Sequence, residues 1–263
     1  MMIVTATNAR AYGLLPIVMV TVGTNYPQSP VYRPEGAVYH HIFFVEKGVG
    51  VLEIEGKSFP LTEGAAVFMR KDVPVRYYGV GEEFKTAWVT FLGEGVDGVL
   101  DYLRAENFAF LKSDSIYLMI VNAYRLAEHN APPEVLSKIA YDILTTFFYE
   151  LKAEQKSLRL VRAKQFVEDN YAKSLSVSDI AEALGVSESL VFRFFNEEEG
   201  ITPSDYIKSV RVRHAEQLLL SEQGLKIGEV SALCGFSNEA YFCKVFKART
   251  GMTPKKYQSR FIH

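Results

Sequence analysis

The chain has 263 residues, of which 48% are apolar and 13% aromatic, and its formal net charge at pH 7 is −2. This composition is typical of a globular protein and excludes a disordered or fibrous chain. The two cysteines, Cys234 and Cys243, are too few for a disulfide-stapled scaffold or a zinc cluster of thiolates. Residues 11–22 are apolar but too short to span a bilayer and lack the pattern of a signal peptide, so we expect a buried strand in a cytoplasmic protein.

Charge is distributed unevenly along the chain. Residues 159–263 carry 15 Lys and Arg against 13 Asp and Glu, whereas residues 1–158 carry 14 against 18. The asymmetry is small, and it has the sign expected if only the C-terminal part meets phosphate groups.

Short β-strands are predicted throughout residues 1–94. The β-prone runs are residues 41–46, 51–55, 58–61, 65–69, 73–78 and 85–91. Turns that contain glycine separate several of them, at residues 47–50, 55–57, 63–64 and 79–83. Many short strands at near-regular spacing are typical of an antiparallel sandwich or barrel.

A helical pattern follows in residues 95–152. Apolar residues recur at helical spacing in three segments, around Leu100, Ile120 and Ile143. Such helices either cover the strand domain or, in addition, form a dimer interface, and the pattern favours neither. The polar residues 153–158 are predicted to link this part to the last domain, residues 159–263.

An internal repeat marks the last domain. Val177, Ile180, Gly185 and Ser187 recur 50 positions later as Ile227, Val230, Gly235 and Ser237, and Phe195, Gly200, Thr202, Pro203 and Tyr206 recur 51 positions later as Phe246, Gly251, Thr253, Pro254 and Tyr257. Two related supersecondary units in tandem are therefore predicted.

Each copy is predicted to be a helix-turn-helix. In the first, Ser176 and Asp179 can form a capping box at the start of a helix. Gly185 ends this helix, because only glycine reaches the left-handed backbone region without steric cost. Ser187 can cap the following helix, which ends at Gly200. A second helix held in this way can enter a major groove.

The second copy repeats the arrangement with Gly235 and Ser237, and Tyr241 is expected to help hold its second helix on the core. A helix that opens at Thr202 and Pro203 joins the copies. About sixteen helical residues separate the two second helices by roughly 25–30 Å, near one turn of duplex DNA.

Residues at fixed spacing in both parts of the chain match a known family. In the C-terminal part they are Gly235, Phe236, Ser237, Tyr241, Phe242, Phe246, Lys247, Gly251, Thr253 and Pro254, with Arg211, Arg213, Ala215, Leu218 and Leu219 before them. In the N-terminal part they are Arg33, Pro34, Gly36, Gly48, Gly50, Glu63, Gly64, Tyr77, Tyr78, Trp88, Val89 and Phe91. The chain thus resembles AraC/XylS-type transcription regulators. The resemblance implies an α+β fold, with an antiparallel cupin-like β-barrel, a helical appendage and an all-α tandem helix-turn-helix domain.

The resemblance also implies base contacts from the second helix of each copy. They are Ser189, Phe192, Arg193 and Asn196 on the first, and Glu239, Ala240, Cys243, Lys244 and Lys247 on the second. Arg193 suits guanine, Phe192 a thymine methyl group and Glu239 the cytosine amino group. The two lysines can meet phosphate or guanine. The alternative for each residue is an ordinary solvated helix face.

One departure from the family concerns charge. Glu197, Glu198 and Glu199 close the first of these helices, where the family carries basic residues. Carboxylates near phosphates weaken binding unless they tilt away. We therefore expect the second helix-turn-helix and dimerisation to supply more of the DNA affinity.

Arg211 lies on the same stripe of the joining helix as Ile207 and Ala215. We expect it to be a structural arginine paired with a carboxylate of a neighbouring helix. Contact with a DNA phosphate is the alternative.

A metal site in the barrel would need converging ligands, and the candidates are His40, His41 and Glu46. Adjacent strand residues point to opposite faces, so the two histidines cannot both enter the interior. Residues 73–78 supply no histidine. We therefore expect no metal, no cofactor and no catalysis.

A small-molecule pocket is the favoured interpretation of the barrel. Arg33 can hold a carboxylate or a pair of hydroxyls, and Trp88, the only tryptophan, can stack on a carbohydrate or aromatic ligand. The resemblance supports these two residues and Tyr77, although strand alternation leaves the choice between Tyr77 and Tyr78 open. The alternative is that the aromatic residues simply fill a small barrel.

Together these observations predict a ligand-responsive, sequence-specific transcription regulator that binds the major groove of double-stranded DNA as a homodimer. Its effector is expected to be sugar-like or a small acid, and RNA polymerase is a further candidate partner. One alternative is a metal-dependent cupin enzyme fused to a DNA-binding domain. The other is an effector-free regulator controlled by a protein partner.

Overall fold

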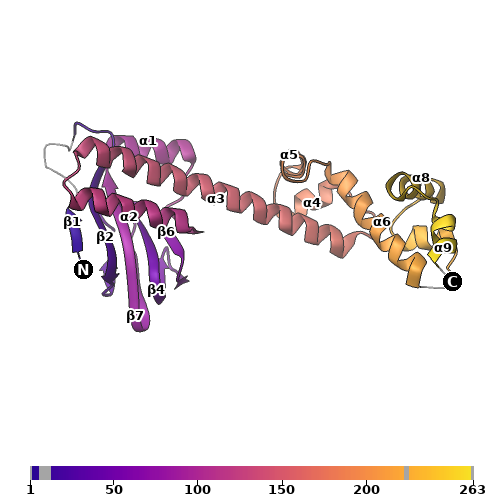
Figure 1. Cartoon of the computed structure of the whole chain (residues 1–263), viewed down its shortest axis with the longest axis horizontal. Coiled ribbons are helices and arrows are strands. Elements are labelled where there is room, and N and C mark those ends of the chain that lie inside the picture. Colours follow the sequence, from indigo (N-terminus) through magenta and orange to yellow (C-terminus); the bar gives the residue numbers. More distant parts are fainter. Residues whose placement is uncertain (1, 6–12, 222–224, 262–263) are drawn as a thin grey trace. The chain divides into compact units, whose positions relative to one another are not determined.

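The computed structural model describes residues 2–5, 13–221 and 225–261, and the chain divides into two compact units, Met1–Glu154 and Gln155–His263 (Figure 1). The N-terminal unit is an antiparallel sheet with helices, and the C-terminal unit is entirely helical, which confirms the α+β class. Residues 153–158, expected to be a linker, lie inside helix α3 (Pro133–Asn170). They contain neither glycine nor proline, so nothing in them ends the helix.

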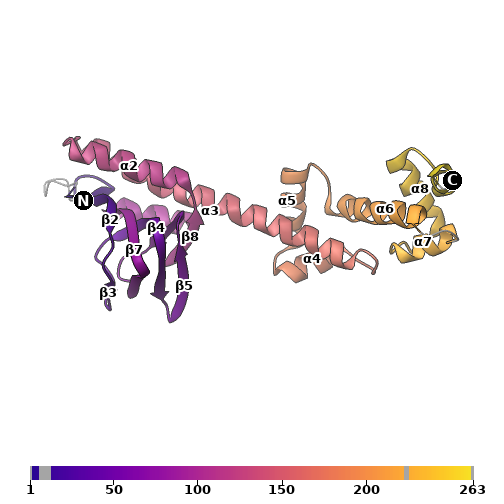
Figure 2. The same cartoon turned by 60° about the horizontal axis from the view of Figure 1, so that its bottom comes forward.

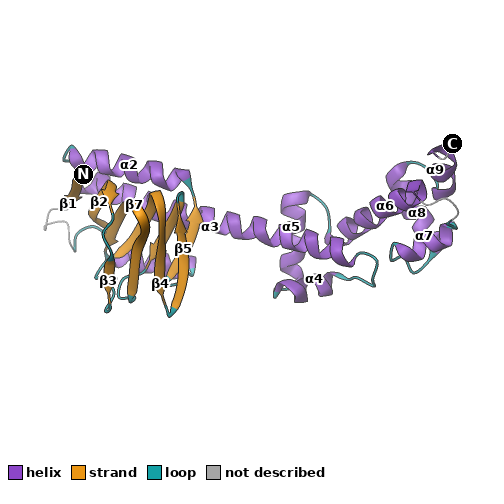
Figure 3. Cartoon of the chain, turned by 90° about the horizontal axis from the view of Figure 1, so that it is seen from below, coloured by secondary structure: helices purple, strands orange, loops and turns teal. Residues whose placement is uncertain are grey.

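The sheet of the N-terminal unit has eight described strands (Figure 3). They are β1 (Met2–Thr5), β2 (Val18–Pro27), β3 (Val31–Arg33), β4 (His40–Ile54), β5 (Lys57–Thr62), β6 (Ala65–Met69), β7 (Val75–Leu92) and β8 (Phe108–Lys112). Their order is β1-β2-β7-β4-β6-β8, with β3 also paired to β7 and β5 also paired to β4. The long strands β4 and β7 therefore form the centre of the sheet. Strand β8 has no counterpart among the predicted strands.

Two predicted turns are wrong. Residues 47–50 and 79–83 do not separate strands but lie inside β4 and β7, which pair with each other from His40 to Ile54. The register of this pairing shifts beside Gly48. A Cβ atom on Gly48 would lie 2.0 Å from the Glu83 carbonyl oxygen, so this glycine permits a close approach of the two strands. Glycine in a strand often marks such a bulge, and its presence gives this segment the sequence pattern of a turn.

Side chains alternate between two cores along the central strands. Ile42 and Phe44 face a core that includes helices α1 (Glu94–Leu103) and α2 (Asp114–Glu128) and the first part of α3 (Figure 1). Phe43 and Val45 face a second core, whose buried residues all come from the strands. No described helix covers this second core, so the sheet itself must curve around it. The interior of the N-terminal unit therefore lies on the side of the sheet that Phe43 faces.

The C-terminal unit contains two helical modules (Figure 2). The first packs the end of α3 with α4 (Val177–Leu184), α5 (Glu188–Glu199) and the start of α6 (Pro203–Ser221). The second packs the rest of α6 with α7 (Ile227–Leu233), α8 (Glu239–Thr250) and α9 (Pro254–Phe261). Helix α6 therefore joins two hydrophobic cores, as the repeat predicts.

The predicted caps explain where most of these helices begin and end. Ser176 and Asp179 form the expected capping box of α4, and Gly185 ends that helix with φ at 65°. The Ser187 hydroxyl accepts a hydrogen bond from the Leu190 amide at the start of α5. In the second module, Asn238 caps α8 by accepting from the Tyr241 amide, so the expected cap at Ser237 is displaced by one residue. Both residue types satisfy the free amides of a helix start.

Candidate DNA-reading helices and effector cavity

Helix α5 presents a polar face to solvent because its apolar residues lie in the core of the first module. Val191, Phe194 and Phe195 are buried. The four expected contact residues lie elsewhere on the helix: Ser189, Arg193 and Asn196 are exposed, and Phe192 is half-buried. This face is therefore free to meet a groove.

Helix α8 has the same construction in the second module. Phe242 and Phe246 are buried, whereas Ala240, Lys244 and Lys247 are exposed and Cys243 is half-buried. Tyr241 was expected to hold the helix on the core, but its side chain is 48% exposed. It lies at the first turn of α8, and its ring meets the Phe236 ring in a T-shaped arrangement at 6.3 Å between centroids.

The Glu239 carboxylate is oriented toward α7. A Cβ atom built on Gly228, in the first turn of α7, would lie 2.6 Å from Glu239 Oε2. Negative charge is stabilised near the amides of a helix start. The carboxylate that was expected to accept from cytosine therefore lies at the start of α7, between the two helices of the module.

Arg211 is a structural residue, but its partners are not carboxylates. Its Nε donates to the Tyr171 carbonyl oxygen and its Nη2 to the Lys173 carbonyl oxygen, both at 2.8 Å. Its guanidinium also lies 5.6 Å from the centre of the Phe236 ring. These contacts join α6 to the segment that follows α3, and they correct the expected partner of Arg211.

The interior of the N-terminal unit contains a cavity of about 290 Å³. It is lined by Thr21, Tyr26, Gln28, Val31, Arg33, Tyr39, His41, Tyr77, Trp88 and Thr90. Three of the four expected effector residues, Arg33, Tyr77 and Trp88, are thus brought together. A more open hollow of about 860 Å³ lies beside the β4–β5 turn, and none of the four expected residues lines it.

Tyr78 is the expected residue that does not reach the cavity. Its hydroxyl donates to Glu53 Oε1 at 3.2 Å, and the Arg76 guanidinium lies over its ring. Tyr77 instead stacks on Phe43, at 5.1 Å between centroids, and burial raises its pKa to about 12. Strand alternation left this choice open, and the structure assigns the cavity to Tyr77.

Trp88 is held in place from two sides. Its indole N–H donates to the Thr21 hydroxyl at 3.2 Å. The Tyr26 ring meets the indole in a T-shaped arrangement at 5.0 Å between centroids. One residue of the cavity wall is therefore fixed before any ligand arrives.

His41 is the cavity residue that sequence reasoning missed as an effector contact. Both of its ring nitrogens are buried without a hydrogen-bond partner. Burial, with the nearby charge of Arg33, lowers its pKa to about 3, so the ring is neutral at pH 7. A neutral imidazole offers one donor and one acceptor. Two unsatisfied polar atoms on a residue that lines a cavity are a physical indication of a polar ligand.

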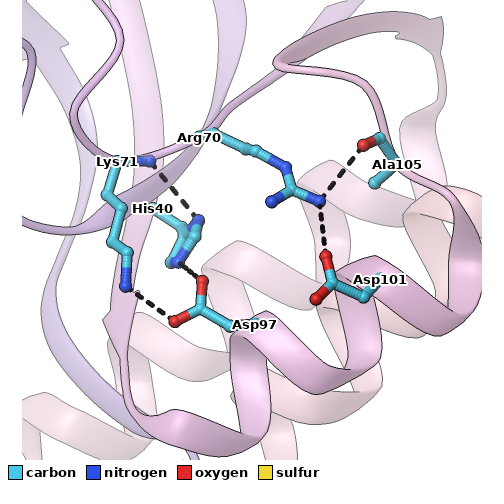
Figure 4. A network of polar contacts seen from close by, with 6 residues as sticks. All are labelled: His40, Arg70, Lys71, Asp97, Asp101 and Ala105. Carbon is cyan, nitrogen blue, oxygen red and sulfur yellow. Dashed lines mark hydrogen bonds and ion pairs between the residues drawn. The ribbon is translucent and has the colours of Figure 1, made fainter.

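His40 points to the opposite face, as strand alternation predicts. Its Nε2 lies 3.3 Å from Asp97 of α1, and its Nδ1 accepts from the Lys71 amide at 3.4 Å (Figure 4). Burial lowers its pKa to about 4. Lys71 also pairs with Asp97 at 2.6 Å, so this network fastens α1 to the sheet.

The third metal candidate, Glu46, is also engaged elsewhere. Its carboxylate accepts from the Asn25 amide at 2.6 Å. Within the described ranges, no three His, Cys, Asp or Glu side chains are grouped so that they could hold a metal ion.

The helices described are all too short or too polar to cross a bilayer.

Comparison with known proteins agrees with this division of the chain. Residues 18–144 match the AraC-like ligand binding domain, and residues 180–260 match a helix-turn-helix domain. The chain is 32% identical over 251 residues to the probable transcriptional regulator LumQ of Photobacterium leiognathi, covering 88% of this chain and 97% of that protein. It is 22% identical over 238 residues to the lactose operon transcription activator of Staphylococcus xylosus, covering 84% of each. A solved AraC-type regulator from Chromobacterium violaceum is 28% identical and covers 42% of this chain and 97% of its own, with a TM-score of 0.39.

The chain therefore belongs to the AraC family of DNA-binding transcription regulators. Its N-terminal unit carries the ligand-binding domain of that family, and its C-terminal unit carries the helix-turn-helix domain. The family consists of transcription regulators and not of enzymes.

Proposed function

We propose that this regulator responds to a small polar molecule, sugar-like or a small acid, bound in the 290 Å³ cavity. The observation that carries the proposal is that His41, a residue of the cavity lining close to the cation of Arg33, holds two buried ring nitrogens without a hydrogen-bond partner. The volume is at the lower end of the roughly 300–1,000 Å³ typical of ligand sites, which favours a small ligand. Similarity to a protein named for the lactose operon agrees with a sugar-like effector.

A thermal-shift screen with monosaccharides, disaccharides and small carboxylic acids tests this proposal. A ligand of the native state must raise the melting temperature. The shift should be lost in Arg33→Ala and kept in Arg76→Ala, which removes the same charge outside the cavity. If no compound of any class shifts the wild type, control by a protein partner becomes the better explanation.

We infer that the exposed faces of α5 and α8 contact DNA bases in the major groove. The inference rests on Ser189, Arg193 and Asn196 of α5 and on Lys244 and Lys247 of α8, all exposed beside buried apolar residues. Selection of bound duplexes from a random pool would define the operator. Arg193→Ala should then lose about 1–3 kcal/mol of discrimination at one guanine. Unchanged preference at every position would remove Arg193 from the base contacts.

We propose a homodimer formed by the helical part of the N-terminal unit, residues 95–152, and action in the cytoplasm. Leu118 of α2 and Tyr149 of α3 are exposed, at 64% and 75%, although both are large apolar residues. Sedimentation of the wild type should give a dimer, and Leu118→Glu with Tyr149→Glu a monomer. A monomeric wild type would overturn this proposal. Contact with RNA polymerase stays a prediction.

A further inference from the structure

The two DNA-reading helices differ sharply in charge. Helix α5 carries one cation, Arg193, against four carboxylates, and three of these carboxylates are Glu197, Glu198 and Glu199 at its end. Helix α8 carries three cations, two of them Lys244 and Lys247, against a single carboxylate. Equivalent elements of the repeat would therefore meet phosphate with opposite net charges.

Two lysines of α3 pair with all three terminal carboxylates of α5. Lys156 Nζ lies 2.7 Å from Glu197 Oε2 and 2.8 Å from Glu198 Oε1. Lys164 Nζ lies 3.0 Å from Glu199 Oε1 and also lies over the Tyr206 ring. Hydrogen bonds to Glu197 and Glu198 raise the pKa of Lys156, and the same contact lowers the pKa of Glu197, so these groups stay charged at pH 7.

These ion pairs are poorly placed to stabilise the fold. Lys156 is 35% exposed and Glu197 is 51% exposed, and pairs this accessible to water contribute little to folding. The ion pairs matter more for the electrostatic potential at the end of α5 than for folding stability, because the two lysines reduce three negative charges to one. At physiological salt the Debye length is about 8 Å. A phosphate at the end of α5 would therefore interact with the summed charge of the lysines and glutamates and not with each carboxylate alone.

We propose that Lys156 and Lys164 are positioning and charge-masking residues of the first DNA-reading helix. By pairing with Glu197, Glu198 and Glu199 they reduce the repulsion that would otherwise keep α5 away from phosphate. The proposal rests on the contact between α5 and DNA proposed above. It explains how this helix tolerates three consecutive glutamates.

The test measures the affinity of the full chain for a duplex selected from a random pool, by fluorescence anisotropy at several salt concentrations. Lys156→Ala with Lys164→Ala should weaken binding roughly tenfold at low salt, and the loss should shrink as salt rises, since it is electrostatic. Lys156→Arg with Lys164→Arg, which keeps both charges, should bind like the wild type. Arg159→Ala, the loss of an exposed cation on the same helix, should change affinity much less.

Rescue separates masking from direct contact between the lysines and DNA. Adding Glu197→Gln, Glu198→Gln and Glu199→Gln to the double alanine variant should restore wild-type affinity. If affinity stays low in this background, the lysines act on DNA themselves and the masking proposal is wrong. The melting curve of the double alanine variant should match that of the wild type. If the double alanine variant is less stable, the variant Lys156→Arg with Lys164→Arg still tests the proposal, because it keeps both charges.

Arg193→Ala distinguishes failure of the proposal from failure of the DNA contact. If Arg193→Ala weakens binding and the lysine variants do not, α5 contacts DNA but is not masked by α3. If neither change affects binding, α5 does not meet the duplex, and both the contact and the masking proposal are overturned.

Discussion

The indole of Trp88 lies directly against the backbone of Gly23. A Cβ atom built on Gly23 would come within 2.5 Å of Trp88 Cη2 and 2.6 Å of Cζ2. Real side chains do not approach so closely, so a glycine at this point of β2 is a condition for the tryptophan in the cavity wall. The two residues pair across strands β2 and β7.

Gly23→Ala should therefore displace the indole. We expect it to lower the stability of the N-terminal unit by about 1–3 kcal/mol, as overpacking does. Trp88 is the only tryptophan and is 9% exposed, so its emission should shift to longer wavelength in the variant. Gly98→Ala in α1, where the added methyl group meets nothing within 4 Å, is the matched control. Identical emission from both variants would contradict the packing described.

His41→Leu should make the N-terminal unit more stable without ligand, and increasingly so in acid. The folded unit holds the pKa of His41 at about 3, against about 6.5 when the chain is unfolded. Between these two pKa values, His41 is protonated in the unfolded chain but not in the folded unit. The stability of the wild type therefore decreases as pH falls from 6.5 toward 3.

Urea unfolding followed by Trp88 emission measures this difference. Between pH 6.5 and 5 the wild type should lose about 2 kcal/mol more than His41→Leu, in proportion to the proton taken up. His40, whose pKa is lowered to about 4, contributes a similar loss to both proteins and so cancels in the comparison. Parallel pH profiles would show that His41 is not buried in this way.

Arg211→Lys should destabilise the C-terminal unit although it keeps the charge. An ammonium group cannot reproduce the two directed bonds from Nε and Nη2 to the carbonyl oxygens of Tyr171 and Lys173. We expect a loss of about 1–3 kcal/mol in the unfolding free energy of the isolated unit, measured by circular dichroism. Arg159→Lys, at an exposed position, should change nothing measurable. Equal stability of both variants would return Arg211 to the candidate phosphate contacts.

Lys244→Ala and Phe192→Ala should weaken DNA binding in distinguishable ways. Affinity for DNA falls as salt rises. Removing a lysine that contacts a phosphate makes the plot of log affinity against log salt less steep, by about 1 in slope. Removing an apolar contact with a thymine methyl group lowers affinity at every salt concentration alike. Equal slopes for wild type and Lys244→Ala would mean that this side chain does not neutralise a phosphate.

The C-terminal unit was predictable because its signals are local. Ser176, Asp179 and Gly185 act within a few residues of the helix that they delimit, and the repeat states the same pattern twice. The partner of Arg211 was not predictable, since backbone carbonyls leave no mark in the sequence. The lysine partners of Glu197 and Glu199 were missed for a related reason, because they lie more than thirty positions away.

The N-terminal unit was less predictable because pairing decides where its strands end. Gly48 and Gly79 are residues typical of turns. Both nevertheless lie inside long strands, because β4 and β7 pair with each other on either side of them. Arg33, Tyr77 and Trp88 were found through family resemblance. His41 could have been found from strand alternation, which places one of two adjacent histidines inside but does not say which one.

The unlike faces of α5 and α8 have a consequence for symmetry. Arg193 and Asn196 on one helix, and Lys244 and Lys247 on the other, would recognise different base steps. A single copy would then prefer a duplex whose two ends differ, and it would bind that duplex in one direction only. Orientation along the chromosome would be set by each copy alone, before any second copy joins.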